Sequence, residues 1–180
     1  VIPRISGNGK EIYSKPILAK DAIKRLESFY FPYHKHLYNL LLESKKRLGY
    51  AILFDCHSMP SKLNLEFSNS KYNNDPDIIL GDLNGTSCSS FLINEVKAIF
   101  EKHNFFVTKN HPFSGGYITK QYGNPSDDIH VIQIEINKKL YMNENSIKKN
   151  ENFENLRTKL TSVIEELSNL YPIRKKIAAE

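Results

Sequence analysis

Apolar residues follow two different spacings along this chain, and each spacing predicts a different kind of element. Intervals of three and four residues are typical of a helix with one face on a core, whereas short apolar runs between turn residues are typical of buried strands. The predicted helices span residues 20–30, 32–49, 89–103 and 152–170. The predicted strands span residues 50–55, 78–80, 105–107 and 129–136. Strands alternating with helices predict an α/β fold, in which a mostly parallel or mixed sheet carries helices on both faces.

Three segments without clear periodicity connect or precede these elements, and the chain of 180 residues is predicted to form a single domain. The predicted irregular segments span residues 1–18, 58–75 and 110–124. The last of them contains Ser114, Gly115 and Gly116. Glycine allows the backbone to approach a ligand closely, so this loop is a candidate binding loop.

Polar side chains follow each predicted strand at the point where the strand ends. They are Asp55 and His57 after the first strand, Asp82 after the second, Asn110 and Ser114 after the third, and Gln133, Glu135 and Asn137 within and after the fourth. Because parallel strands bring their carboxyl ends together, these side chains are expected to converge at one edge of the sheet. For any single loop, an Asp and a His that merely cap and hydrogen-bond are the alternative interpretation.

The last strand has the sharpest pattern. Apolar and polar residues alternate over residues 132–137, so Gln133, Glu135 and Asn137 share one face of the strand. A strand with one solvated face gives the same alternation. Within an otherwise apolar sheet, however, Glu135 is expected to be partly desolvated, which raises the pKa of its carboxyl group toward the range useful for proton transfer.

His57 and Glu135 together suggest metal-assisted hydrolysis, because a carboxylate can take a proton from water bound to zinc. Such a site needs about three protein ligands. The chain has no His-Glu-x-x-His motif and no second histidine at ligand spacing from His57. The residues alone therefore indicate a hydrolytic cleft with an incomplete metal site.

Charge, apolar runs and cysteine content indicate which partners and which cellular compartment to expect. The net charge is +5, from 25 basic and 20 acidic residues, and its densest basic clusters, residues 45–47 and 174–176, resemble solvated helix ends. No basic stripe interleaved with aromatic residues is present, so no nucleic-acid partner is expected. No apolar run approaches the length of a membrane span, and no membrane partner is expected. Two cysteines, Cys56 and Cys88, fit a reducing compartment, which predicts a cytoplasmic protein.

Five blocks of this sequence together resemble the N-formylglutamate amidohydrolase family, whose members are zinc enzymes with a fold similar to that of zinc-dependent carboxypeptidases. The blocks lie within residues 25–34, 54–60, 80–88, 110–117 and 133–142. The resemblance implies a hydrolase-like, zinc-carboxypeptidase-like fold. It also implies zinc-dependent hydrolysis of the amide bond of N-formyl-L-glutamate or a related N-acyl amino acid, which gives formate and the amino acid in histidine degradation.

The resemblance also implies roles for individual residues. His57 matches the last zinc ligand of the family, and Glu135 matches its general base and acid. The residues expected to bind substrate are Asn110, Ser114, Gly115, Gly116 and Arg25, the last through a substrate carboxylate. The residues expected to support the site are Asp55, Asp82, Gln133 and Asn137.

One departure from the family pattern changes the expectation for this chain. The family's other two zinc ligands come from an upstream block with a Pro-His-Ser-Gly-like motif and a following acidic residue, and no such block precedes His57 here. The chain thus resembles the C-terminal two thirds of a member without the N-terminal segment, with an incomplete Zn²⁺ site. Self-association is expected through the surface that this segment would cover. The alternative is a catalytically inactive family remnant that binds a small carboxylate or a protein partner.

Overall fold

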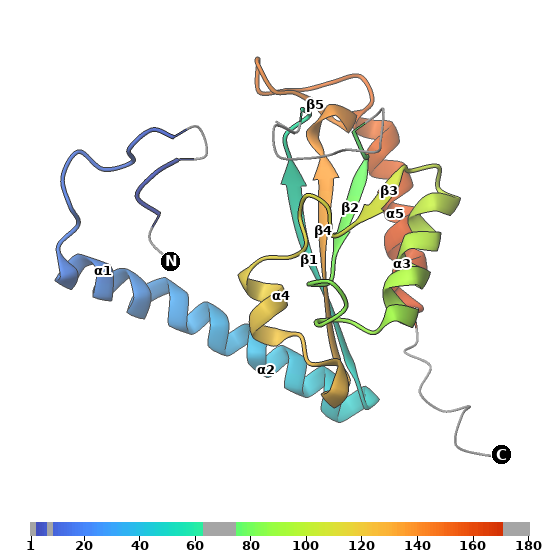
Figure 1. The fold of residues 1–180 in the computed structure, drawn as a ribbon, viewed down its shortest axis with the longest axis horizontal. Coiled ribbons are helices and arrows are strands. Elements are labelled where there is room, and N and C mark those ends of the chain that lie inside the picture. The colour runs from blue at the N-terminus through green and yellow to red at the C-terminus, as the bar shows by residue number, and fades with distance from the viewer. Residues whose placement is uncertain (1–2, 7–8, 63–74, 171–180) are drawn as a thin grey trace.

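The computed structural model describes residues 3–6, 9–62 and 75–170, and these form a mixed α/β structure (Figure 1). Four strands make the main sheet: β1 (Ala51–Met59), β2 (Ile78–Gly81), β3 (Val107–Lys109) and β4 (Ile129–Asn137). The larger helices are α1 (Ala19–Arg25), α2 (Phe31–Leu48), α3 (Ser90–Lys102), α4 (Tyr117–Tyr122) and α5 (Phe153–Ser168). Short elements complete the fold: the π-helix η1 (Leu26–Tyr30), the 3₁₀ turns η3 (Pro125–Asp127) and η4 (Lys138–Leu140), and the hairpin β5 (Met142–Asn143) and β6 (Lys148–Lys149).

The main sheet has the strand order β1-β4-β2-β3 and is mixed. β1 runs parallel to β4, and β2 runs parallel to β3, but β2 is antiparallel to β4. The expectation of an α/β fold with a mostly parallel or mixed sheet is confirmed. The expected meeting of all strand ends at one edge is wrong, because β2 and β3 run opposite to β1 and β4.

Each face of the sheet packs on its own set of helices (Figure 1). Helices α3 and α5 cover one face, where the core includes Ile78, Leu92, Phe100, Ile132 and Val163. Helices α2 and α4 cover the other face through a smaller cluster. In that cluster, Leu41 of α2 and Tyr122 of α4 pack with Ala51, Ile129 and Val131, which lie at or near the beginnings of β1 and β4. Further along the same two strands, this second face becomes polar.

The local sequence explains where several helices begin and end. Ser89 caps α3, because its hydroxyl oxygen accepts a hydrogen bond from the N–H of Leu92 at 3.3 Å. Gly49 ends α2 in a left-handed conformation with φ 83°, which glycine adopts without steric cost. The two helices predicted over 20–30 and 32–49 form one continuous helical run. A π-helical turn precedes Pro32, a residue that has no N–H to continue the regular α-helical pattern.

Other sequence predictions differ from the structure at element boundaries and in loops. The strand predicted at 105–107 lies at Val107–Lys109, because Phe105 instead follows α3 into the core with its N–H bonded to the Phe100 carbonyl. Helix α4 lies within the predicted loop 110–124. Strand β1 continues to Met59, and residues 63–74 of the predicted loop 58–75 lie outside the described residues.

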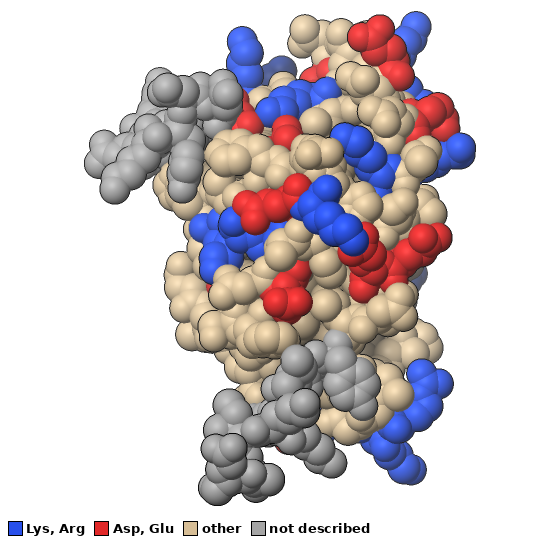
Figure 2. All heavy atoms as spheres, turned by 90° about the vertical axis from the view of Figure 1, so that its right-hand side faces the viewer, with Lys and Arg blue, Asp and Glu red and all other residues tan. Residues whose placement is uncertain are grey.

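Two further features of the described residues bear on possible partners: the apolarity of the helices and the distribution of charge on one side of the molecule. None of the described helices is both long and apolar enough to cross a membrane. On the side of the molecule that lies to the right in Figure 1, positive and negative side chains are interspersed (Figure 2). Of the two basic clusters noted in the sequence, the first lies at the end of α2, where Lys45 forms an ion pair with Asp127. The second, residues 174–176, lies outside the described part of the chain.

Candidate active site

The two adjacent parallel strands β1 and β4 bring four of the predicted side chains together on one face. Asp55 lies opposite Gln133, and His57 lies opposite Glu135. Side chains two apart on a strand share a face, so all four occupy the polar continuation of the face that α2 and α4 cover. The sequence-predicted residues therefore meet in the middle of a sheet face rather than at the sheet edge.

The four side chains form two short pairs. His57 Nε2 lies 3.1 Å from Asp55 Oδ2, and Gln133 Nε2 donates a hydrogen bond of 2.8 Å to Glu135 Oε1. The His57 side chain is 48% exposed, whereas Glu135 is only 8% exposed. The arrangement thus combines an accessible imidazole with a buried carboxylate on the neighbouring strand.

Burial raises the pKa of the Glu135 carboxyl group above its usual range, because the charged form loses hydration. His57 and the hydrogen bond from Gln133 act in the opposite direction and favour the charged carboxylate. Asp55 adds a smaller upward contribution through like charge. The prediction that the alternating strand holds a desolvated carboxylate with a raised pKa is confirmed.

Asp82 and Asn110 hold two loops together beside this face. Asp82 is buried, and its Oδ1 accepts hydrogen bonds from Asn110 Nδ2 at 2.7 Å and from the Gly85 N–H at 2.9 Å. Asn110 Oδ1 accepts from the N–H groups of Asp82 and Asn84. The Asn110 amide is therefore engaged at both ends in loop structure, and its contact with a substrate stays a prediction.

The loop 114–116 crosses the sheet close to the buried polar residues. A Cβ atom on Gly81 would lie 2.7 Å from the carbonyl carbon of Ser114 and 2.8 Å from the nitrogen of Gly115. Only a glycine at position 81 leaves room for this crossing. A Cβ on Gly116 would lie 3.1 Å from Gln133 Oε1. The structure therefore brings the predicted binding loop against Gln133, next to Glu135.

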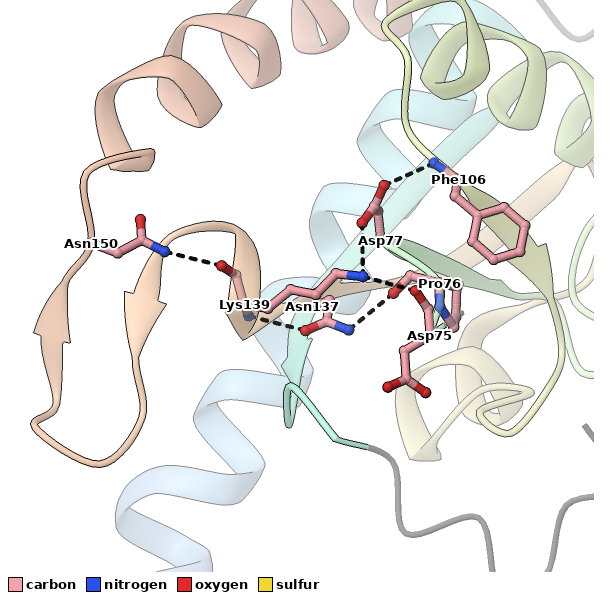
Figure 3. Close-up of polar contacts among 7 residues, drawn as sticks. All are labelled: Asp75, Pro76, Asp77, Phe106, Asn137, Lys139 and Asn150. Carbon is pink, nitrogen blue, oxygen red and sulfur yellow. Dashed lines mark hydrogen bonds and ion pairs between the residues drawn. The ribbon is translucent and has the colours of Figure 1, made fainter. Parts of the chain in front are cut away.

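Asn137 is fully buried, and its side chain bonds backbone groups at the end of β4 rather than the polar residues around Glu135 (Figure 3). Its Nδ2 donates to the Pro76 carbonyl at 3.0 Å, and its Oδ1 accepts from the Lys139 N–H at 3.0 Å. Lys139 Nζ in turn bonds the Asp75 carbonyl and lies 3.2 Å from Asp77 Oδ1. Asn137 thus ties β4 to residues 75–77.

Arg25 lies apart from the other candidate residues. It is exposed at the end of α1, which extends away from the sheet (Figure 1). Its Nη1 donates a hydrogen bond of 2.8 Å to the Tyr13 hydroxyl, and its guanidinium lies over the Tyr13 ring. The structure does not bring Arg25 to the face that carries His57 and Glu135.

An aromatic cluster that the sequence analysis missed attaches the binding loop to α2. The Tyr30 hydroxyl donates a 2.6 Å hydrogen bond to the Tyr117 hydroxyl, and His34 Nδ1 lies 2.5 Å from the Tyr122 hydroxyl. Tyr117 directly follows Gly116, so the cluster fixes one end of the loop that contacts Gln133. The helical spacing of Tyr30 and His34 was the available signal, since these residues share one face of the helix.

The described residues do not make a complete metal site. No group of three or more His, Cys, Asp or Glu side chains in this part of the chain is arranged to hold a metal ion. His57 has the accessibility and the carboxylate partner that metal-ligating histidines usually have. One histidine falls short of the three protein ligands of a catalytic zinc site.

Comparison with known proteins gives consistent matches. A sequence model of the N-formylglutamate amidohydrolase family matches residues 1–142. An N-formylglutamate deformylase from Pseudomonas putida is 35% identical over 120 residues, which are 66% of this chain and 43% of that protein. One from Pseudomonas aeruginosa is 30% identical over 140 residues, which are 76% of this chain and 51% of that protein. The chain spans about half the length of these curated relatives.

Solved structures agree with the sequence matches. The crystal structure of an N-formylglutamate amidohydrolase from Ralstonia eutropha JMP134 superimposes with a TM-score of 0.81 and 28% identity. The match covers 88% of this chain and 56% of that one. A protein from Agrobacterium tumefaciens matches with a TM-score of 0.60 and 16% identity over 92% of this chain and 62% of its own. The second match supports the fold alone.

Proposed function

The chain belongs to the N-formylglutamate amidohydrolase family, and from that premise we propose that it supplies the general acid–base part of an amide-hydrolysing site. The proposed substrate is N-formyl-L-glutamate or a related N-acyl amino acid, which yields formate and the amino acid. The curated relatives named N-formylglutamate deformylase support this substrate class. The observation that carries the proposal is the buried Glu135 carboxylate directly across from the accessible His57.

In the proposed reaction, Glu135 moves the proton. Its carboxylate takes a proton from the water that attacks the formyl carbon and passes it to the nitrogen of the leaving amino acid. A raised pKa suits the first step, because the carboxylate accepts a proton more readily, and the protonated group can then donate that proton to the leaving nitrogen. Gln133 holds one carboxylate oxygen, which leaves the other to face the substrate.

We propose that His57 contributes one ligand to a zinc ion. Asp55 lies beside Nε2, which leaves Nδ1 as the ring nitrogen to bind the metal, and a carboxylate partner of this kind orients metal-ligating histidines. The other ligands would have to come from outside the described residues. We therefore assign no reaction step to the metal.

The two cysteines are free, in keeping with a cytoplasmic location.

The incomplete metal group among the described residues favours one second candidate: a family remnant that binds a small carboxylate or a protein partner without hydrolysing it. The two candidates differ in a measurable way. The hydrolase binds zinc and releases formate, whereas the remnant does neither.

The test is an assay of formate release from N-formyl-L-glutamate by the native gene product that contains this sequence, together with its zinc content. We expect Glu135→Gln to lower kcat by about 10²- to 10⁴-fold, the usual contribution of a general acid–base group. Glu95→Gln, which changes an exposed glutamate on α3, is the matched control and should retain activity. Absence of formate release from the unaltered protein overturns the proposed reaction, and full activity in Glu135→Gln overturns the role of Glu135.

A further inference from the structure

The helical run formed by α1, η1 and α2 carries a second stripe of side chains, apart from the residues that pack on the sheet. The run contacts the core through Leu37 and Leu41. Eight other residues, spaced three or four apart along the run, are all exposed. We call them the flank stripe: Asp21, Arg25, Phe29, Tyr33, His36, Leu40, Glu43 and Arg47. Residues at these intervals lie on one side of a helix, and intervals of four suit the wider π turn at Leu26–Tyr30.

The centre of the flank stripe is apolar and strongly exposed. Phe29 is 74% exposed, Tyr33 56% and Leu40 49%. Contiguous exposed side chains of this size are typical of an interaction surface rather than of a solvated helix face. Charged residues lie at both ends of the stripe, Asp21 and Arg25 at one end and Glu43 and Arg47 at the other.

The flank stripe is complementary to itself in the reversed direction. When a second copy of the helix is turned end for end about a point between Tyr33 and His36, each residue meets a suitable partner. The facing pairs are Asp21 with Arg47, Arg25 with Glu43, Phe29 with Leu40, and Tyr33 with His36. Both charge pairs join opposite signs, and each occurs twice because a two-fold interface uses the same patch on both subunits.

We propose that the flank stripe is the interface of a homodimer, in which the helical runs of two copies pack antiparallel to each other. The apolar centre provides the attraction, and the outer charge pairs fix direction and register. The stripe extends over 26 residue steps, roughly 40 Å at the helical rise of about 1.5 Å per residue. A contact of that length brings the central and the outer pairs together at the same time.

A groove beside the stripe fits this arrangement. It has a volume of about 480 Å³ and is lined by Pro3 and Tyr13 on one side and by Phe29 and Tyr33 on the other. In the proposed dimer, the second copy's Leu40, which faces Phe29, enters this groove. The hydrogen bond from Tyr13 holds Arg25 at the edge of the same groove, where it meets the second copy's Glu43.

Sedimentation equilibrium of the native gene product that contains this sequence tests the proposal with a charge exchange. The unaltered chain should form dimers in the micromolar range. Glu43→Arg places two like-charged pairs in the interface and should weaken dimerisation at least about tenfold, since facing like charges are strongly unfavourable. Arg25→Glu should have the same effect. The double variant Arg25→Glu/Glu43→Arg restores opposite charges and should dimerise like the unaltered chain.

Lys35→Glu is the matched control, because Lys35 is an exposed basic residue of the same helix outside the flank stripe. It should leave the dimer unchanged, and circular dichroism should give the same helix content for every variant. A folded monomer at all concentrations overturns the proposal and points to another polypeptide as the occupant of the stripe. The proposal is also overturned if the single variants Glu43→Arg and Arg25→Glu dimerise as strongly as the unaltered chain, or if the double variant does not regain dimerisation.

Discussion

At the scale of single residues, the site depends on how one carboxylate is balanced between burial and nearby polar groups. Glu135 is almost completely buried, which favours its neutral form, while Gln133 and His57 favour its charged form. The result is a pKa raised above the usual value but limited in its rise. A carboxylate with a raised pKa is a stronger base than a surface glutamate, which suits it to accept a proton from water.

Gln133→Met tests that balance, because it keeps side-chain length and removes the donated hydrogen bond. The charged form of Glu135 loses its 2.8 Å donor, so the pKa of Glu135 should rise further. Titration of the Glu135 carboxyl carbon by NMR measures the change directly. The control is Gln121→Met on the exposed face of α4, which should leave that titration unaltered. A pKa that is unchanged or lower in Gln133→Met contradicts this account.

At the scale of elements, the sequence predicted what each strand carries but not how the strands run. The alternation over residues 132–137 correctly predicted that Gln133 and Glu135 share a buried face. The direction of β2 relative to β4 depends on long-range pairing, such as Ile79 opposite Glu135, and no local pattern encodes it. The same holds for Asn110, because its bonds to Asp82 join loops that are 28 residues apart. Arg25 was predicted to bind a substrate carboxylate because of its charge, but its helix does not reach the candidate site.

The contact between α3 and α5 is an element-scale feature with a defined pH dependence. Glu166 on α5 accepts hydrogen bonds from Lys102 and His103, at 2.8 and 2.7 Å, and these partners lower its pKa. A lowered pKa means that folding favours the charged carboxylate. Its contribution to stability is therefore complete above the ordinary glutamate pKa and is lost as the pH falls through the lowered value.

We expect Glu166→Gln to lower the urea midpoint of unfolding modestly at pH 7, as is usual for exposed ion pairs. The difference from the unaltered protein should shrink as the pH falls below the ordinary glutamate value of 4.5. Glu165→Gln changes the adjacent exposed residue and should produce no such pH-dependent difference. A Glu166→Gln effect that is constant between neutral and acidic pH would show that the contact of Glu166 with Lys102 and His103 does not act through charge.

At the scale of the whole molecule, one face of the sheet packs the main hydrophobic core, and the other carries the candidate site. The face under α3 and α5 is apolar throughout the central strands, whereas on the other face the apolar cluster under α2 and α4 lies toward the beginnings of β1 and β4. The polar half of that face is therefore available for Asp55, His57, Gln133 and Glu135 without disturbing the core. The loop 114–116 spans the boundary, and its close approach to β2 requires that Gly81 carry no side chain.

Gly81→Ala should therefore disturb both the packing and the polar face. The new methyl group would overlap with backbone atoms of Ser114 and Gly115, which cannot rotate away as a flexible side chain would. We expect a loss of about 1–3 kcal/mol in the free energy of unfolding, the usual cost of overpacking. Gly116→Ala is the matched comparison, since its methyl group meets only the end of the Gln133 side chain, at 3.1 Å, and its φ of −101° suits alanine. Urea unfolding of both variants should place Gly81→Ala well below Gly116→Ala, and equal stabilities would mean that the loop does not cross the sheet at Gly81.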